Sequence, residues 1–591
     1  MRASRAGLVA LLVAAMLGGC LGGQGDGRVR PGLDINAPGG EPAIYLPPGP
    51  QVGAAPESII RGFLRAGAVT GDAITVAQSF LTRSATPRWN PDLGTVVIGG
   101  ENEVKVVDNG DGRYAVSASL VGRIDARGRY SRASTAAEVT MSVRLVSVEG
   151  QWRLTELPGD FGRWMTQGGV RQLLQPVAVH YVAASSDALI PDVRWLSGDR
   201  LATRLVRAQL GAVPNYLEGA ARTDLGGGVK LVVDAVPVVD GIATVDLGTV
   251  GLPTDVSARR NIWAQLVATL LQAPNVVAVE VAVEGAPLEL PGVSGPVSSL
   301  SQLGLRTVAL PSEADSLLRI GARVYPVDLD HVLEPGLESL TAAGSTFPAI
   351  SGQWTNLARS FVGNEIAAVS VNGTALARWH PTGALPPAVF ASRLTRPTYD
   401  RTNVLWVGGL GSGANASARL WALNAAVDPT NGEASTPYPV EVVWLSDRVV
   451  RSVDVSLDGL RVAIVSTDSA GVDARLDVAG INRRPNGLPV ALAAVPMRLA
   501  AHLVDIRDAT WISPTELGVL GRDPQEAEGG PFFVTLGDDT RKLSPLEGAH
   551  ALTTLGGERG LALITANSVA LRAGTRWITL PSATDLAVPA R

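Results

Sequence analysis

The second half of the chain alternates short apolar runs with turn-forming residues, and the runs recur every 40 to 60 positions or so. One four-stranded sheet cannot bury both of its faces, so a repeat of roughly this length with several strands per unit is typical of a β-propeller. The pattern predicts a propeller of about six blades over residues 310–591. The apolar runs begin at Val324, Ile366, Val404, Val462, Leu517 and Leu561.

Three details of this half refine the prediction. Ser456-Leu457-Asp458-Gly459 is expected to form a tight turn with left-handed geometry at Gly459. The residues after Leu561 have room for two or three strands, so a strand such as Arg306–Leu310 is expected to complete the last blade. The tryptophans are expected to pack between blades rather than to form a sugar-binding platform: Trp354, Trp379, Trp406, Trp421, Trp444, Trp511 and Trp577.

Helical spacing marks the start of the first half. Ile59, Ile60 and Phe63 repeat at i, i+3 and i+4, and Pro56 suits the first turn of that helix. Strand-like runs follow as far as Leu154. Helices packed on an antiparallel sheet over residues 41–165 resemble a small cone-shaped α+β domain of the NTF2-like kind.

Residues 175–290 combine a strand, two amphipathic helices and a hairpin turn at Asp240-Gly241. This order resembles the GerMN domain of spore-germination and related envelope proteins. Gly211-Ala212-Val213-Pro214 departs from the tighter Gly-Pro turn expected there. The resemblance implies a second α+β domain that serves as a binding module and supplies no catalytic residue. The matching positions are Gly241, Val245-Asp246-Leu247, Gln265-Leu266-Val267, Leu270, Pro274, Val276, Val279 and Gly285.

The single cysteine of the chain, Cys20, follows a 13-residue apolar stretch, Gly7–Gly19, and two N-terminal arginines. That stretch suits a signal peptide over residues 1–19 and is too short to span a membrane. Leu17-Gly18-Gly19-Cys20 resembles a bacterial lipobox, which implies a diacylglyceryl group on the Cys20 thiol and an N-acyl chain such as palmitate. Residues 20–40 are then a lipidated flexible tether, with lipid as the sole anchor. The alternative is an ordinary secretory peptide with an incidental cysteine.

Composition narrows the chemistry. Net charge is −5 and no basic run occurs, so nucleic acid is not an expected partner. The absence of a Gly-Lys dipeptide excludes a P-loop. The histidines have no metal-binding spacing, and the adjacent acids are interpreted as turn and solvation residues, so no catalytic, metal or cofactor site is assigned. A carboxylate pair formed by residues distant in sequence stays open. The residues concerned are His180, His331, His380, His502 and His550, with Asp328, Asp330, Asp538 and Asp539.

In its order of lipobox, two α+β domains and propeller, the whole chain resembles the actinobacterial LpqB lipoprotein family. The resemblance implies a non-enzymatic accessory to the extracytoplasmic region of a sensor histidine kinase of the MtrB type, with effects on envelope integrity and cell division. It places the protein on the outer face of the cytoplasmic membrane. Two alternatives remain: a cell-wall or glycan-binding structural lipoprotein in contact with peptidoglycan, and a propeller-based hydrolase or lyase.

Overall fold

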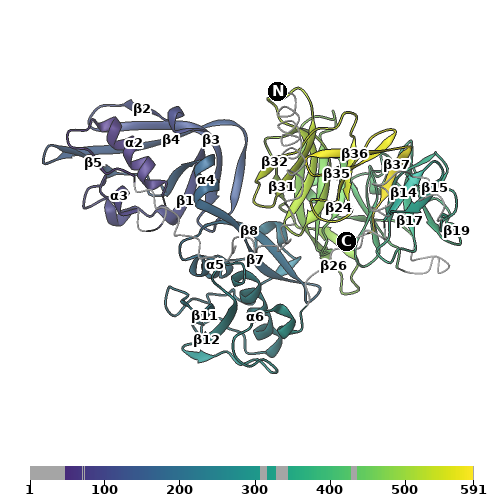
Figure 1. Cartoon of the computed structure of the whole chain (residues 1–591), viewed down its shortest axis with the longest axis horizontal. Coiled ribbons are helices and arrows are strands. Elements are labelled where there is room, and N and C mark those ends of the chain that lie inside the picture. The colour runs from purple at the N-terminus through teal and green to yellow at the C-terminus, as the bar shows by residue number, and fades with distance from the viewer. Residues whose placement is uncertain are drawn as a thin grey trace, which may run out of the picture. The chain divides into compact units, whose positions relative to one another are not determined.

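Strands dominate the computed structural model, which describes residues 47–69, 71, 74–305, 316–327, 344–426 and 436–589, without the side chains of 134–136 (Figure 1). This confirms the mainly β fold class with helices in the first half. The predicted signal peptide 1–19, Cys20 and the tether 20–40 lie outside the described residues.

The first region is an α+β domain built on a sheet with strand order β5-β4-β3-β1-β6, in which β2 also pairs with β3. Pro56 opens helix α2, which buries Ile59, Ile60 and Phe63 in the domain core, as the helical spacing predicts. The indole of Trp89 donates to the Gly162 carbonyl at 2.7 Å and fixes the end of the domain. The elements are α2 (Pro56–Gly67), α3 (Ile74–Gln78), β1 (Gly94–Ile98), β2 (Lys105–Asp108), β3 (Arg113–Asp125), β4 (Tyr130–Val148), β5 (Gln151–Glu156) and β6 (Arg163–Thr166).

The second region contains a β-α-β unit. Strands β11 (Ile242–Leu247) and β12 (Ala278–Val283) pair in parallel, and α6 (Val256–Leu270) connects them. Asp255 caps α6 by accepting from Ala258 N at 2.8 Å. The hairpin turn at Asp240-Gly241 is confirmed, since both residues have positive φ. The other elements are α4 (Gln167–Leu173), β7 (Leu174–Ala183), β8 (Leu189–Ser197), α5 (Leu201–Gln209), β9 (Ala221–Arg222), β10 (Val238–Val239) and β13 (Ala286–Pro287).

The described part of the second half forms six sheets, which are the blades of the propeller. They are, from the innermost strand outward, β37 (Ala583–Ala587), β14 (Leu317–Ile320), β15 (Arg323–Pro326); β16 (Trp354–Arg359), β17 (Ile366–Ser370), β18 (Leu376–His380), β19 (Gly383–Ala384); and β20 (Thr398–Tyr399), β21 (Val404–Gly408), β22 (Leu420–Asn424), β23 (Tyr438–Val440). Then follow β24 (Val449–Val455), β25 (Arg461–Thr467), β26 (Arg475–Arg483), β27 (Pro489–Leu492) with β28 (Met497–Leu499); β29 (Val504–Ser513), β30 (Glu516–Arg522), β31 (Gly530–Thr535), β32 (Thr540–Lys542); and β33 (Ala551–Thr554), β34 (Leu561–Ile564), β35 (Ser568–Ala573), β36 (Arg576–Pro581).

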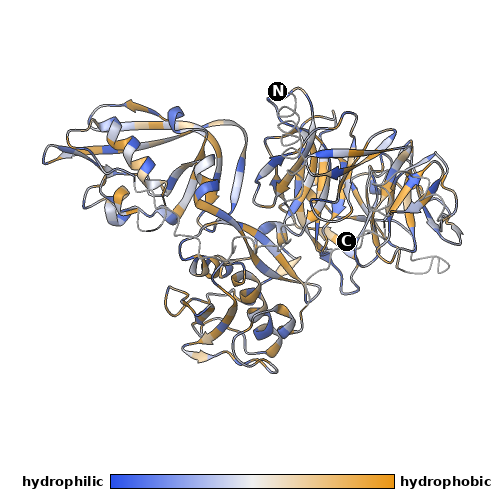
Figure 2. Ribbon diagram, in the orientation of Figure 1, coloured by the Kyte–Doolittle hydropathy of each residue, from blue (hydrophilic) through white to orange (hydrophobic). Residues whose placement is uncertain are grey.

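The repeated apolar runs become the second strands of five sheets: β17, β21, β25, β30 and β34. These strands are buried along nearly their whole length, because each lies between sheet neighbours and between two adjacent blades. Figure 2 shows the apolar residues gathered along the strands of these sheets. Val324 is an exception. It lies in β15, the third strand of its sheet, so it was wrongly aligned with the other runs.

A strand from the C-terminal end of the chain closes the ring of described blades. Residues 551–581 already supply a four-stranded sheet, and β37 pairs antiparallel with β14 at the other end of the propeller sequence. Arg306–Leu310, expected to complete the last blade, lies outside the described residues. The sequence from Ser456 to Gly459 forms the predicted turn, with Gly459 at φ 72° and Asp458 accepting from Leu460 N.

Strands β7 and β8 share a hydrophobic core with the propeller inside the compact unit Pro48–Arg591. Tyr181 and Ile190 pack in the same cluster as Trp511. Buried Arg461 of β25 donates to the Pro191 carbonyl at 3.1 Å, and the Trp195 indole donates to the Gly537 carbonyl at 2.9 Å. The second region is therefore packed against the blades and not merely linked to them.

Candidate functional site

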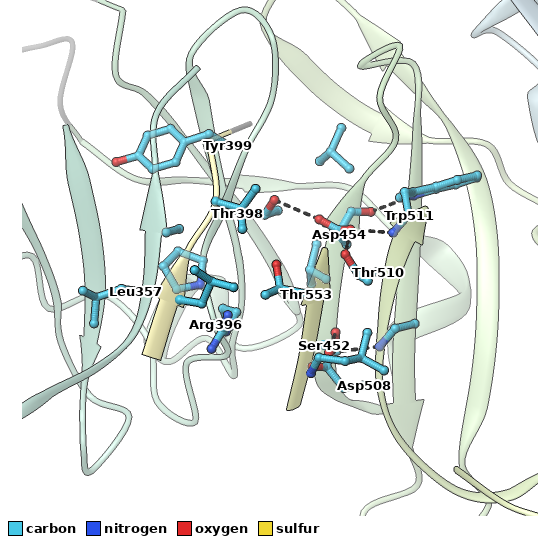
Figure 3. Close-up of a pocket in the computed structure, with 18 of the residues that line it drawn as sticks. Leu357, Arg396, Thr398, Tyr399, Ser452, Asp454, Asp508, Thr510, Trp511 and Thr553 are labelled. Carbon is cyan, nitrogen blue, oxygen red and sulfur yellow. Dashed lines mark hydrogen bonds between the residues drawn. The ribbon is translucent and has the colours of Figure 1, made fainter. Parts of the chain in front are cut away.

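A small cavity lies where the innermost strands of the blades converge (Figure 3). Its walls come from β16, β20, β24, β29, β33 and β37, and its volume is about 70 Å³. A space of this size is well below the roughly 300 Å³ of the smallest usual ligand pockets. Polar side chains from several blades reach into the cavity, so their hydrogen bonds decide what it can do.

Three aspartates of the inner strands each link their own blade to a neighbouring one. Asp585 of β37 accepts from Leu357 N at 2.7 Å, and Asp508 of β29 accepts from Leu552 N at 2.9 Å. Asp454 of β24 accepts from Trp511 N at 2.8 Å. Each carboxylate thus satisfies a main-chain donor of the neighbouring blade that the sheet itself leaves unpaired.

The second oxygen of each aspartate is also occupied. Figure 3 shows Asp454 between Thr398, which donates at 3.1 Å, and the pair of Thr510 and Trp511. The Ser452 hydroxyl donates to Asp508.

The remaining aspartate of the three carries the ion pair of the cavity. Arg396 donates to Asp585 at 2.7 Å. Burial raises the pKa of Asp508, while the hydroxyl of Ser452 favours its charged form. Carboxylates saturated with donors in this way are suited to cross-linking blades and poorly suited to general acid–base catalysis.

These axial aspartates were not singled out from the sequence. A partial signal does exist, because Asp454 and Asp508 precede the apolar runs at Val462 and Leu517 by nearly the same distance. Aligning those two blades would have brought both positions into one column, whereas none of the recurring apolar runs follows Asp585. Carboxylates that are distant in sequence do meet at the axis, where donors of the neighbouring blades engage them.

No group of three or more metal-ligating residues is found in the described ranges. His180 packs in the second region, where burial lowers its pKa to about 4, and its Nδ1 is 3.2 Å from the Thr269 hydroxyl. Burial also lowers the pKa of His502 to about 4. His380 contacts Glu365 at 3.0 Å, and His331 lies outside the described residues.

The interpretation of the adjacent acids needs one correction. Asp538 does occupy a turn, with φ 58°, but its side chain is buried rather than solvated. It accepts from Ala500 N at 2.6 Å through one oxygen, and burial raises its pKa to about 7. Asp539 pairs with Arg171 of α4 at 2.9 Å. Asp328 and Asp330 lie outside the described residues.

The seven propeller tryptophans are buried or half-buried. The four buried ones share hydrophobic clusters with residues of an adjacent blade, which agrees with the predicted packing between blades: Trp379, Trp406, Trp421 and Trp511. Trp406 is fully buried, and its indole donates to Asp400 at 3.1 Å. Cys20, the predicted lipidation site, lies outside the described residues. Among the helices of the described ranges, none has the length and apolar content needed to cross a bilayer.

Three family models match consecutive parts of the chain. Residues 49–170 match the N-terminal domain of lipoprotein LpqB, and residues 338–590 match the LpqB beta-propeller domain. Residues 174–289 match a model described as sporulation and spore germination. The three matches fall in the order that the resemblance implies.

Curated relatives extend the similarity to most of the chain. A protein named Lipoprotein LpqB from Cutibacterium acnes is 26% identical over 548 residues, which are 88% of this chain and 87% of that protein. One of the same name from Thermobifida fusca is 24% identical and covers 97% of this chain and 95% of its own length. The relative from Bifidobacterium longum is 32% identical over 214 residues, 37% of that protein.

A solved structure is similar to a smaller part of the chain. The tandem GerMN domains of the sporulation protein GerM from Bacillus subtilis are 22% identical, cover 22% of this chain and 45% of that chain, and superpose with a TM-score of 0.17.

Proposed function

Since the chain belongs to the LpqB lipoprotein family, we propose that it is a membrane-anchored accessory regulator of a sensor histidine kinase of the MtrB type. It is attached by lipid on Cys20 to the outer face of the cytoplasmic membrane and contacts the extracytoplasmic region of the kinase. Its action affects envelope integrity and cell division. The family membership carries this proposal.

The axial site supports a role in binding rather than in turnover. Asp454, Asp508 and Asp585 are engaged by main-chain and side-chain donors of neighbouring blades. A hydrolase or lyase at this position needs a carboxylate or histidine free to exchange a proton with its substrate. The burial of the propeller tryptophans likewise disfavours the glycan-binding alternative, which needs exposed aromatic faces.

A regulator of this kind needs no chemistry of its own. It shifts the signalling equilibrium of the kinase only by binding one state more tightly than the other. Lipid anchoring in the same bilayer raises the effective concentration of the lipoprotein near the kinase, so a modest intrinsic affinity is sufficient.

The test is reconstitution of the lipidated protein and the kinase in one vesicle, with the lipoprotein on the side of the sensor region. We expect the rate of kinase autophosphorylation to change with lipoprotein density, and C20S added at equal bulk concentration to act more weakly. Identical rates with and without the lipoprotein over a broad range of densities would refute the proposal. A pull-down on purified peptidoglycan then decides whether wall binding replaces it.

A further inference from the structure

A second, larger pocket lies beside the axial cavity, at the entry ends of β24 and β29. Its volume is about 720 Å³, which falls in the range of small-molecule sites. The two inner strands run from one site into the other: Arg451 and Arg507 line the pocket, and the next residues, Ser452 and Asp508, line the axial cavity.

Positive charge predominates in this pocket. Arg451, Arg498, Arg507 and Arg522 line it, against the carboxylates of Asp473 and Asp505. Both carboxylates are already engaged. Asp505 pairs with Arg522 at 2.8 Å, and Asp473 lies 4.0 Å from Arg498. At the edge of the pocket Asp473 also pairs with Arg475 at 2.6 Å and with Arg448 at 3.1 Å.

Two guanidinium groups are therefore left without a counter-charge. Arg451 donates to the Thr467 hydroxyl at 3.3 Å, and no carboxylate pairs with it in the described ranges. Arg507 has no polar partner in those ranges. Both side chains are exposed, and they stand on adjacent inner strands of a chain whose net charge is −5.

The backbone at both arginines departs from regular pairing. The register of β24 shifts between Val450 and Ser452, and that of β29 shifts between Val504 and Asp508. A bulge re-aims the side chain at the extra residue, and bulges are frequent next to binding sites. In each of two neighbouring blades, a register shift thus coincides with an arginine that lines this pocket.

We propose that this pocket binds a phosphomonoester, with Arg451 and Arg507 as the residues that hold the phosphoryl group. Such a group carries a charge of about −1.5 to −2 and three acceptor oxygens, so one ligand neutralises two guanidinium groups. A carboxylate has one charge and is satisfied by a single arginine fork. The ligand is a soluble sugar or polyol phosphate, or the headgroup of a phosphomonoester lipid. This site needs no partner protein and stands independently of the kinase contact.

The test is calorimetric titration of the full lipidated chain in detergent with glycerol 3-phosphate, and with glycerol and acetate as comparators. We expect saturable binding of glycerol 3-phosphate alone. The double variant R451Q/R507Q should weaken it at least about tenfold, since charge-assisted hydrogen bonds are lost. The matched control is R323Q/R576Q, which removes two exposed arginines of β15 and β36 that make no ion pair within the described residues.

Lipid and soluble sources are separated by placing the chain in phosphatidylcholine nanodiscs with or without phosphatidic acid. Competition by phosphatidic acid supports the site with a lipid headgroup as its ligand, and unchanged titration supports it with a soluble ligand. The proposal is overturned if glycerol 3-phosphate does not bind, or if both double variants weaken binding equally. It is also overturned if an acidic peptide binds in the pocket where glycerol 3-phosphate does not.

Discussion

Removing the Asp400 carboxylate should open a gap between two blades. Asp400 follows β20, its side chain is fully buried, and it pairs at 2.7 Å with Arg483 of β26, which is 4% exposed. It also accepts from Val404 N at 3.0 Å and from the Trp406 indole at 3.1 Å. One carboxylate thus joins its own blade to the next one.

The expected cost follows from what D400A leaves behind. Breaking a buried ion pair by removing one partner costs about 3–5 kcal/mol, because the remaining charge stays buried without compensation. In a domain of this size that corresponds to a fall in the melting temperature of the order of 10 °C. R483A should cost less, because Asp400 still has the main-chain and indole donors.

The assay is thermal unfolding of the full chain, monitored by tryptophan fluorescence. Variants are compared with this same probe, because a chain of several domains does not unfold in one step. The control is D447A, which removes an exposed carboxylate that pairs with no described residue and should change stability by less than about 0.5 kcal/mol. If D400A has the same melting temperature as D447A, the buried ion pair does not hold the blades together and the reasoning is wrong.

Four further predictions concern other parts of the chain. W406A should lower the free energy of unfolding by about 3–5 kcal/mol in denaturant titration, because the ring is fully buried; an unchanged midpoint contradicts this. C20S should release the protein from membranes in fractionation, and retention after a salt wash contradicts lipid as the sole anchor. His180 has a folded pKa of about 4, so the unfolded chain binds more protons and stability falls as pH drops from about 6.5 to about 4; H180N should flatten that slope in melting curves, and an equal slope contradicts the assignment. The pKa of Asp538 is raised to about 7, so the cost of its buried charge to stability grows as pH rises from about 4 to about 7. D538N should therefore raise the melting temperature more at about pH 8 than at about pH 5, and an equal gain at both pH values contradicts this.

Local pattern was sufficient for the elements that depend on near neighbours. The helix at Ile59–Phe63, the turn at Asp240-Gly241 and the buried second strands of five blades follow from periodicity and turn chemistry. The placement of Val324 failed because β14 and β15 are both short apolar strands, and the pattern does not say which of them is second in the sheet.

Pairings over long distances were beyond the reach of the pattern. The antiparallel pairing of β37 with β14 depends on which strand edge is still unpaired once the other blades have formed. The role of Asp454, Asp508 and Asp585 depends on main-chain donors of the neighbouring blade, and these become visible only when the strands are placed side by side. Burial of Asp538 has the same origin, because the turn that holds it is covered by distant residues.

The pairing of β37 with β14 determines when the propeller can close during synthesis. Synthesis runs from the N-terminus, so the ribosome makes β14 at the start of the propeller and β37 after all the other described blades. Until then β14 presents an unpaired edge, and the nascent ring stays open. A chaperone that shields this edge during translation would therefore protect the whole ring until it closes. A nonsense codon shortly before Ala583 would remove the closing strand and leave the whole ring open.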